Sequence, residues 1–366
     1  MPTGLLDLPV EILTQICSQL PPDSWYHDVK KRQRSLASLS LTSHTLRTIA
    51  QPILYHQLHA YEYRAAFHFL RALLRTPRLA EHVRVINILH GGIQTLRDQT
   101  EIRKVEEAAV EYGIELPDVW NKSVRARDEG NNFDSYGYFT PEYSGPVTAT
   151  LVAFLLRLTS QLEEAHWRMF SGLMKLDHFR HQITPLQSLR RLTISSSSAR
   201  SGWIFDHVLP VIAAAPNLQF LHLDQCGAVG TRSSIDHITL TTQALPLARL
   251  TELHLTKGAP YGLVVPFLNA VGPSLRKLTI EYEVGRIVDS WAKGVVKHPG
   301  FALDDGEIVM EPGFPGWIEE LISRWQDSGT LEEVTIRYTN DMFRTISTHT
   351  EHAACKHAHA YKAVVI

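Results

Sequence analysis

The sequence predicts an α/β fold in which three N-terminal helices precede an irregular solenoid of parallel strands. Three observations lead to this prediction. Apolar residues recur at helical spacing through the first fifty-five residues. From residue 83 onward, a hexad recurs in which the first, fourth and sixth positions are apolar. Helical segments precede several of these hexads, so each repeat unit is expected to hold one strand and one helix.

The first helix is expected to begin after Asp7, which can cap it. Its first turn would hold Leu8 and Pro9, and a proline is tolerated there because its missing N–H would be unpaired anyway. A single apolar stripe then follows at helical spacing, formed by Ile12, Leu13, Ile16 and Leu20.

Two further helices are expected before residue 55. The charged stretch from Asp23 to Arg34 is interpreted as a solvated loop. The second helix carries an apolar stripe of Leu36, Leu39 and Leu41. Ser43 can cap a third helix, which Pro52 would end.

The hexads predict strands that bury one face, because their fourth and sixth positions alternate with polar residues. Seven copies are present: Val83-Ile86-Ile88, Leu162-Ala165-Trp167, Leu189-Leu192-Ile194, Leu218-Leu221-Leu223, Leu250-Leu253-Leu255, Leu275-Leu278-Ile280 and Leu331-Val334-Ile336. The middle copies begin at residues 162, 189, 218, 250 and 275, and this spacing is typical of degenerate leucine-rich-type repeats. A doubly wound α/β sheet and an accidental pattern of Leu and Ile are the alternatives.

The domain boundaries follow from these patterns. Residues 1–58 form the helical domain and residues 59–340 the repeat domain, with inserts near 97–148 and 284–316. A helix is expected near Arg97 to Tyr112. Residues 341–366 lack the hexad and are expected either to be disordered or to cap the last repeat.

The N-terminal order of residues resembles an F-box of the form common in fungal F-box families. The resemblance rests on Leu8-Pro9 to Leu13, the segment from Ser35 to Ser43, and the closing Leu54-Tyr55, with support from Leu116-Pro117-Asp118-Val119-Trp120. It implies docking to the Skp-type adaptor of a cullin–RING ubiquitin ligase. The residues that the resemblance places at or behind this contact are Leu8, Pro9, Ile12, Leu13, Ile16, Leu36, Leu39, Leu41 and Ser43.

A target protein is expected to bind the concave face of the repeats, to which the third, fifth and seventh hexad positions point. Phe220 is a candidate anchor there, since aromatic side chains are enriched at interface hot spots; the alternative is that it packs under a long loop. The candidate target-binding residues are Phe220, His222, Asp224, Glu252, His254, Lys277, Thr279 and Glu281.

Composition and motifs exclude several other functions. A net charge of −2 and a pI near 6.8 give no field that favours nucleic acid or an anionic membrane. The three scattered cysteines, the lack of a signal peptide and the short apolar runs predict a cytoplasmic or nuclear protein.

No catalytic, metal or cofactor site is expected. Phosphate-binding glycine loops, Gly-x-Ser-x-Gly and His-Glu-x-x-His are missing from the sequence. The cluster of His349, His352, Cys355, His357 and His359 lacks the paired spacing of a zinc site. We therefore expect a non-catalytic substrate-recognition subunit of a ubiquitin ligase, or else an interaction scaffold whose N-terminal helices only cap the solenoid.

Overall fold

The computed structural model describes residues 5–19, 26–60, 63–88, 99–116, 141–169, 183–196, 209–224, 247–256, 271, 274–283, 301–304, 307–310, 332–339 and 362–365. The chain divides into two compact units. One unit comprises residues 1–192 with 207–215, and the other comprises residues 193–206 with 216–366. Residues 117–140, which hold most of the Leu116-to-Trp120 motif and part of the insert near 97–148, lie outside the described residues.

The first unit opens with the short 3₁₀ helix η1 (Leu5–Asp7) and helix α1 (Val10–Ser18). The prediction that Asp7 caps α1 and that Leu8 and Pro9 form its first turn was wrong. Pro9 is the N-cap residue, and its ψ of 147° is extended rather than helical. Its carbonyl accepts hydrogen bonds from the N–H groups of Ile12 (3.0 Å) and Leu13 (3.1 Å), so the helix begins after it.

Helix α2 (Tyr26–Thr42) is longer than expected. The interpretation of the charged stretch before Arg34 as a loop was wrong from Tyr26 onward. Val29 (4% exposed) and Leu36 (1% exposed) lie two turns apart on the buried side of α2. Lys and Arg are good helix formers, so the charged segment continues the helix, and its buried side packs on the neighbouring helices.

Helix α3 (His44–His56) begins as predicted and ends later than predicted. The N–H of Leu46 donates to the Ser43 hydroxyl (3.1 Å), which confirms the predicted cap. Pro52 lies inside the helix instead of ending it. Ile53 and Leu54 pack against the buried helical core beyond the proline, and this tertiary contact holds the last turn in place.

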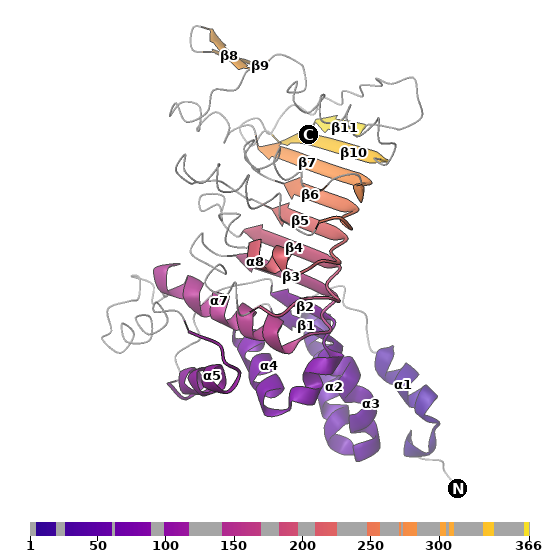
Figure 1. Cartoon of the computed structure of the whole chain (residues 1–366). Coiled ribbons are helices and arrows are strands. Elements are labelled where there is room, and N and C mark those ends of the chain that lie inside the picture. Colours follow the sequence, from indigo (N-terminus) through magenta and orange to yellow (C-terminus); the bar gives the residue numbers. More distant parts are fainter. Residues whose placement is uncertain are drawn as a thin grey trace. The chain divides into compact units, whose positions relative to one another are not determined.

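Strand β1 (Gln57–Ala60) follows α3 without an intervening residue (Figure 1). It pairs in parallel with β2 (Val85–Ile88), and β2 pairs in parallel with β3 (Glu164–Met169). Strand β4 (Arg191–Ser196) begins in the same unit. The remaining helices of this unit are α4 (Tyr63–Arg75), η2 (Pro77–His82), α5 (Gln99–Glu111), α7 (Pro141–Leu158) and α8 (Leu209–Ala213). Helix α4 packs on β1 and on α7 (Figure 1).

A glycine ends α5 close to its predicted end at Tyr112. Gly113 has a φ of +61°, a left-handed value that side chains rarely adopt. The N–H of Ile114 donates back to the carbonyl of Ala109 (2.8 Å), as in a Schellman motif.

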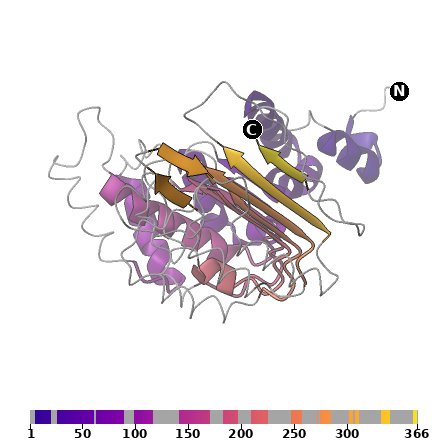
Figure 2. The same ribbon diagram turned by 90° about the horizontal axis from the view of Figure 1, so that it is seen from above.

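The second unit is a parallel sheet whose described strands lie in the order β5, β6, β7, β10, β11. Figure 2 shows β10 and β11 running in the same direction. Strand β11 falls in the segment for which disorder or capping was expected, and a β8–β9 hairpin lies within the predicted 284–316 insert. The bounds are β5 (Phe220–Asp224), β6 (Glu252–Thr256), β7 (Lys277–Glu283), β8 (Phe301–Asp304), β9 (Glu307–Met310), β10 (Glu333–Thr339) and β11 (Lys362–Val365).

The hexads account for these strands. In the copies from Val83 to Leu278, each described residue at the first, fourth and sixth positions is at most 2% exposed. The burial of Leu331, Val334 and Ile336 in the last copy lies outside the described residues. Residues along β5 and along β6 alternate strictly between half-buried and buried. The predicted fold class, helices followed by a parallel-stranded α/β region, is therefore confirmed.

The same pattern of backbone hydrogen bonds joins the start of each strand to the start of the next. The carbonyl of the second hexad residue accepts from the N–H groups of the second and third residues of the next copy, at 2.8–3.1 Å. In the second unit this carbonyl belongs to Gln219, Thr251 and Arg276 in turn. In the first unit it belongs to Arg84 and Glu163. Each step therefore fixes the register of the strand that follows it.

Candidate interaction surfaces

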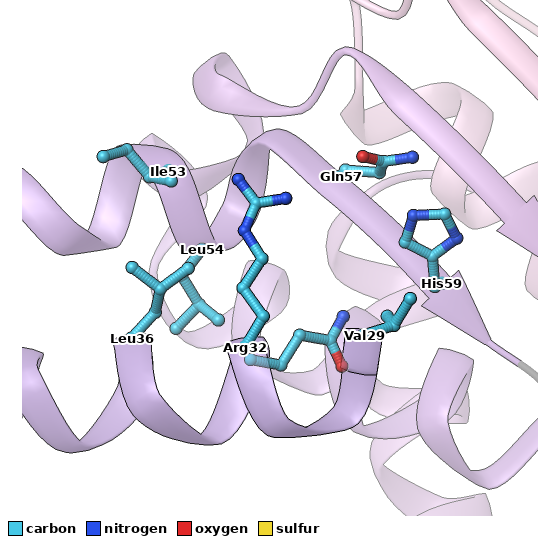
Figure 3. Close-up of a pocket in the computed structure, with 8 residues that line it drawn as sticks. Val29, Arg32, Leu36, Ile53, Leu54, Gln57 and His59 are labelled. Carbon is cyan, nitrogen blue, oxygen red and sulfur yellow. The ribbon is translucent and has the colours of Figure 1, made fainter. Parts of the chain in front are cut away.

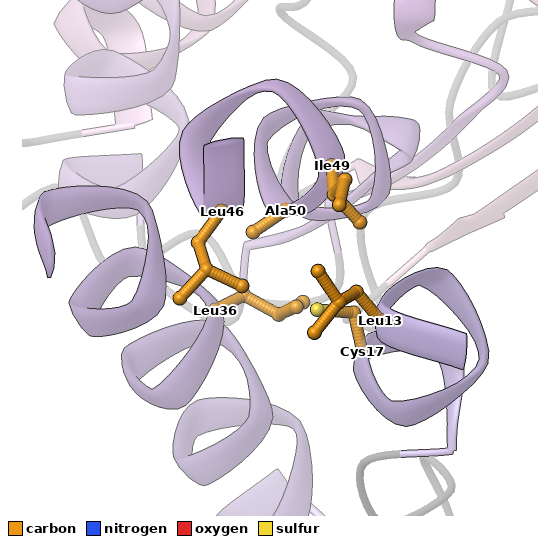
Figure 4. Close-up of a cluster of buried hydrophobic side chains, with 6 residues drawn as sticks. All are labelled: Leu13, Cys17, Leu36, Leu46, Ile49 and Ala50. Atoms are coloured by element: carbon orange, nitrogen blue, oxygen red, sulfur yellow. The ribbon is translucent and has the colours of Figure 1, made fainter. Parts of the chain in front are cut away.

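The N-terminal helices share one small core. Figure 4 shows Leu13 and Cys17 of α1 pointing toward Leu36 of α2 and toward α3. The α3 residues of this cluster are Leu46, Ile49 and Ala50, and Leu39 packs against it from α2. Leu13, Leu36 and Leu39 were expected on apolar helix faces, whereas the burial of Cys17 was not predicted.

Helix α1 has two apolar faces. Leu13 and Cys17, four residues apart, are 2% and 1% exposed and face the core. Ile12 and Ile16, also four residues apart, are 42% and 41% exposed. The single stripe expected from the sequence is therefore two stripes, of which only one is used inside the unit.

Further exposed apolar side chains lie at the start of the chain. Leu6, Leu8 and Val10 are 53%, 36% and 54% exposed. Among the described residues, five of the seven large apolar side chains that are exposed lie between residues 6 and 16. Such a concentration on one short segment is typical of a surface that binds a partner.

The nine residues that the resemblance placed at or behind the adaptor contact fall into two groups. Leu8, Pro9, Ile12, Ile16 and Leu41 are exposed, with Leu41 at 78%. Leu13 and Leu36 are buried, Leu39 is half-buried against the core, and Ser43 caps α3. The buried residues and Ser43 stabilise the helices that carry the exposed residues.

The cavity beside these helices is too small for an organic ligand. It has a volume of about 20 Å³, which is room for one water. Figure 3 shows Arg32 of α2 and His59 of β1 on either side of it. Its other lining residues are Val29, Gln33, Leu36, Ile53, Leu54 and Gln57.

Burial affects two ionisable side chains near these helices. It raises the pKa of the Cys17 thiol above its usual range. It also raises the pKa of Tyr55, whose ring lies 5.5 Å from that of Phe69 in α4. Both shifts disfavour the charged form, so neither group is poised for chemistry near neutral pH.

The polar face of β5 and β6 brings predicted target-binding residues together. His222 lies opposite His254 in the register, with ring centroids 5.7 Å apart. The ring of Phe220 lies 5.1 Å from that of His254, tilted by 46°. All three rings are half-buried, so they form one aromatic group that we call the ring cluster: Phe220, His222 and His254.

A chain of hydrogen bonds fixes one end of the ring cluster. The Thr256 hydroxyl donates to Oδ1 of Asp224 (2.8 Å). The same hydroxyl oxygen lies 3.0 Å from Nε2 of His222, which is therefore the donor in that contact. In this arrangement His222 carries a hydrogen on Nε2.

Strands β7 and β10 extend the same face. Lys277 lies opposite Glu252 on one side and Glu333 on the other, and its ammonium group is 3.7 Å from Oε2 of Glu333. Thr279 is half-buried and lies opposite His254. The register places Glu281 opposite Arg337, but the side chain of Glu281 is outside the described part of the chain.

No cluster of three His, Cys, Asp or Glu side chains that could hold a metal is found among the described residues. The histidine-rich group from His349 to His359 lies outside them. Among the described residues, no helix combines the length and apolar character needed to span a membrane.

Comparison with known families bears on the N-terminal unit. Residues 5–60 match the family model described as F-box-like. These residues form an F-box-like domain. The match ends at Ala60, the last residue of β1, so the F-box-like domain includes the first strand of the sheet. No curated protein matches the chain.

An eighth hexad was missed by the sequence analysis. Tyr55, Leu58 and Ala60 occupy its first, fourth and sixth positions, and Leu58 and Ala60 are 3% and 0% exposed. The same spacing of apolar residues is present in the sequence at residues 55–60. The last hexad residue of the F-box-like domain is thus also a core residue of the sheet.

Proposed function

We propose that this chain is the substrate-recognition subunit of a cullin–RING ubiquitin ligase. The F-box-like domain binds a Skp-type adaptor through the exposed apolar face of α1. The polar face of the sheet binds the target protein. The chain itself supplies no catalytic group, and it acts by holding target lysines near the ubiquitin-conjugating enzyme.

The observation that carries this proposal is the F-box-like match to residues 5–60 together with the second apolar face of α1. A helix whose inward face is already satisfied by Leu13 and Cys17 gains nothing in the monomer from Ile12 and Ile16. Their exposure is explained if they are buried in a complex.

The target-binding half of the proposal rests on the sheet. We infer that the repeats are of the leucine-rich type, as in the fungal F-box families that the sequence resembles, and that their polar face receives the target. Extended faces of this kind serve for binding in repeat proteins. The proposed location is the cytoplasm or the nucleus, where the ubiquitin system operates.

Adaptor binding tests the first half. Purified full-length protein is titrated with a purified Skp-type adaptor, and the affinity is compared between the native chain and Ile12→Asp. We expect Ile12→Asp to weaken binding by at least tenfold, because a carboxylate cannot be buried at an apolar interface without losing its hydration.

The matched control is Thr14→Asp, which adds the same charge to an exposed position on a different side of α1. It should leave adaptor affinity within about twofold of the native value, since isolated surface substitutions have small effects. Native protein that fails to bind the adaptor, or an Ile12→Asp variant that binds it normally, would overturn the docking claim.

A scaffold outside any ligase is the second candidate. It is favoured by one observation, namely that β1 makes the F-box-like domain the terminal unit of the sheet, as a solenoid cap would be. The two candidates differ in cullin recruitment. The ligase requires that the adaptor-bound protein bring the cullin–RING subunits into one complex on size-exclusion chromatography, and the scaffold predicts that it does not.

A further inference from the structure

Charge is distributed unevenly over the polar face of β5 and β6. The side chains on this face are the ring cluster, Thr256, and two carboxylates, Asp224 and Glu252. Neither strand contributes a lysine or arginine to the face. On the neighbouring strand, Lys277 is already within 3.7 Å of Glu333. The charged side chains that β5 and β6 themselves contribute to this face are therefore both carboxylates.

The two carboxylates stand at opposite ends of the ring cluster. Glu252 lies opposite Phe220, and Asp224 lies four residues farther along β5, opposite Thr256. A strand rises by about 3.3 Å per residue, so the carboxylates are separated by roughly 13 Å along the strand direction. The rings of Phe220, His222 and His254 fill the interval between them.

This arrangement matches a particular spacing in an extended partner. Alternate side chains of an extended segment point to the same side, so positions i, i+2 and i+4 would face the sheet together. Positions i and i+4 are also roughly 13 Å apart. Basic groups at these two positions would meet Glu252 and Asp224, while an apolar or aromatic group at i+2 would rest on the ring cluster.

We propose that the polar face of β5 and β6 binds an extended basic segment of the target, with Lys or Arg at positions i and i+4 and an aromatic or large aliphatic residue at i+2. The inference rests on the proposed function, because it names the chemical class of the captured target. Opposite charge gives orientation and selectivity, and the central contact between rings gives affinity. A basic group beside Phe220 also gains from the face of its aromatic ring.

The hydrogen-bond chain described above supports this use of Asp224. Thr256 holds Oδ1 of Asp224, which fixes the orientation of the carboxylate before a partner arrives. Such preorganisation lowers the entropic cost of binding.

The test uses fluorescent synthetic peptides and the full-length protein without adaptor. The probe has the central sequence Arg-Ser-Trp-Ser-Arg between Gly-Ser flanks. One comparison peptide replaces both arginines by glutamates, and another keeps the composition in the order Arg-Arg-Trp-Ser-Ser. Affinities are measured by fluorescence anisotropy at low and at physiological salt, since attraction between exposed charges is screened by salt.

We expect the probe to bind at least tenfold more tightly than the glutamate peptide and several-fold more tightly than the reordered one. Phe220→Leu and Glu252→Gln should each weaken probe binding by at least fivefold. Both substitutions are conservative in size, and a circular-dichroism melt of each variant checks that the fold is kept. The matched control is Glu332→Gln, which removes a carboxylate that is paired with Arg276 and lies outside the β5–β6 face.

Equal affinity for the probe and the glutamate peptide would overturn the inference. Equal losses in Glu252→Gln and Glu332→Gln would overturn it too, because they would show attraction to overall charge rather than to this face. Adaptor binding through α1 is measured on the same preparations. Loss of probe binding with adaptor binding intact contradicts only the basic-segment inference, and the reverse result contradicts only the proposed ligase function.

Discussion

The backbone N–H of Arg84 donates a hydrogen bond of 2.9 Å to the carbonyl of His56. His56 is the last residue of α3, and Arg84 precedes β2. This bond is the first of the steps that link each strand to the next, and it starts from a residue of the F-box-like domain. The helices and strands β1–β3 are consequently parts of the first unit, and no linker separates α3 from β1.

Deletion of the F-box-like domain is expected to unfold the sheet that follows it. Removing residues 1–60 takes away β1 and leaves β2 as an edge strand with its parallel partner missing on one side. The truncated protein should aggregate, or lose its cooperative thermal transition. Deleting residues 1–9, which ends before α1, serves as the control and should preserve the transition. A stable, monomeric chain starting at residue 61 would contradict this prediction.

The two faces of α1 should respond differently to truncation of their side chains. Leu13→Ala opens a cavity in the helical core and should lower the free energy of unfolding by about 2–5 kcal/mol. Ile12→Ala removes an exposed side chain and should change it by no more than about 0.5 kcal/mol. Urea titration monitored by circular dichroism distinguishes them. Similar losses for the two variants would mean that Ile12 is part of the core.

Loss of the Ser43 cap should destabilise α3. The hydroxyl of Ser43 accepts from the Leu46 N–H, so Ser43→Ala should cost about 1 kcal/mol in thermal or urea unfolding. Ser43→Asp keeps an acceptor at the N-terminal end of the helix and should restore most of the stability. If Asp rescues nothing, the cap contributes through packing rather than through its hydrogen bond.

The buried thiol of Cys17 should make stability depend on alkaline pH. Burial raises the pKa of this thiol in the folded state, so the unfolded chain loses the proton first as pH rises. The protonated Cys17 thiol contributes its full stabilisation to the folded state below the unfolded-state pKa of about 8.5. This stabilisation declines as the pH rises above that value. In a Cys226→Ser, Cys355→Ser background, the free energy of unfolding should fall between pH 8 and pH 10 more steeply with Cys17 than with Cys17→Ala.

The same background allows a direct measurement of access to Cys17. A thiol that is 1% exposed and held in its protonated form should react with an alkylating reagent far more slowly in the folded protein than in urea. Equal rates in the two conditions would contradict the burial of Cys17.

The strands were the most predictable part of the fold. In strand β6, Leu253 and Leu255 alternate with Glu252, His254 and Thr256. This alternation predicts that one face of the strand is buried. The rings that meet on its polar face followed from the same periodicity, because residues at matching hexad positions become neighbours once the strands are parallel. The sequence was therefore enough to predict the buried face wherever apolar and polar residues alternate along a strand.

The features that were not predicted, in helices α1, α2 and α3, depend on tertiary contacts. Pro52 reads as a helix end, yet packing of the residues after it on the helical core keeps α3 intact. The charged start of α2 was interpreted as a loop, yet it is helical, and Val29 and Leu36 are buried on one side of the helix. The division of α1 into an inner and an outer apolar face depends on where α3 packs, which no local pattern specifies.

The backbone hydrogen bonds between the starts of successive strands also indicate where another protein could be inserted into the chain. Arg276 and Glu332 lie more than twice as far apart in the chain as Thr251 and Arg276, yet both intervals end in the same pair of backbone hydrogen bonds. The register therefore depends on the hexads and not on the length of chain between them. A fluorescent protein inserted at the tip of the β8–β9 hairpin, between Asp304 and Glu307, should leave the sheet unaltered and report on the protein from within the chain.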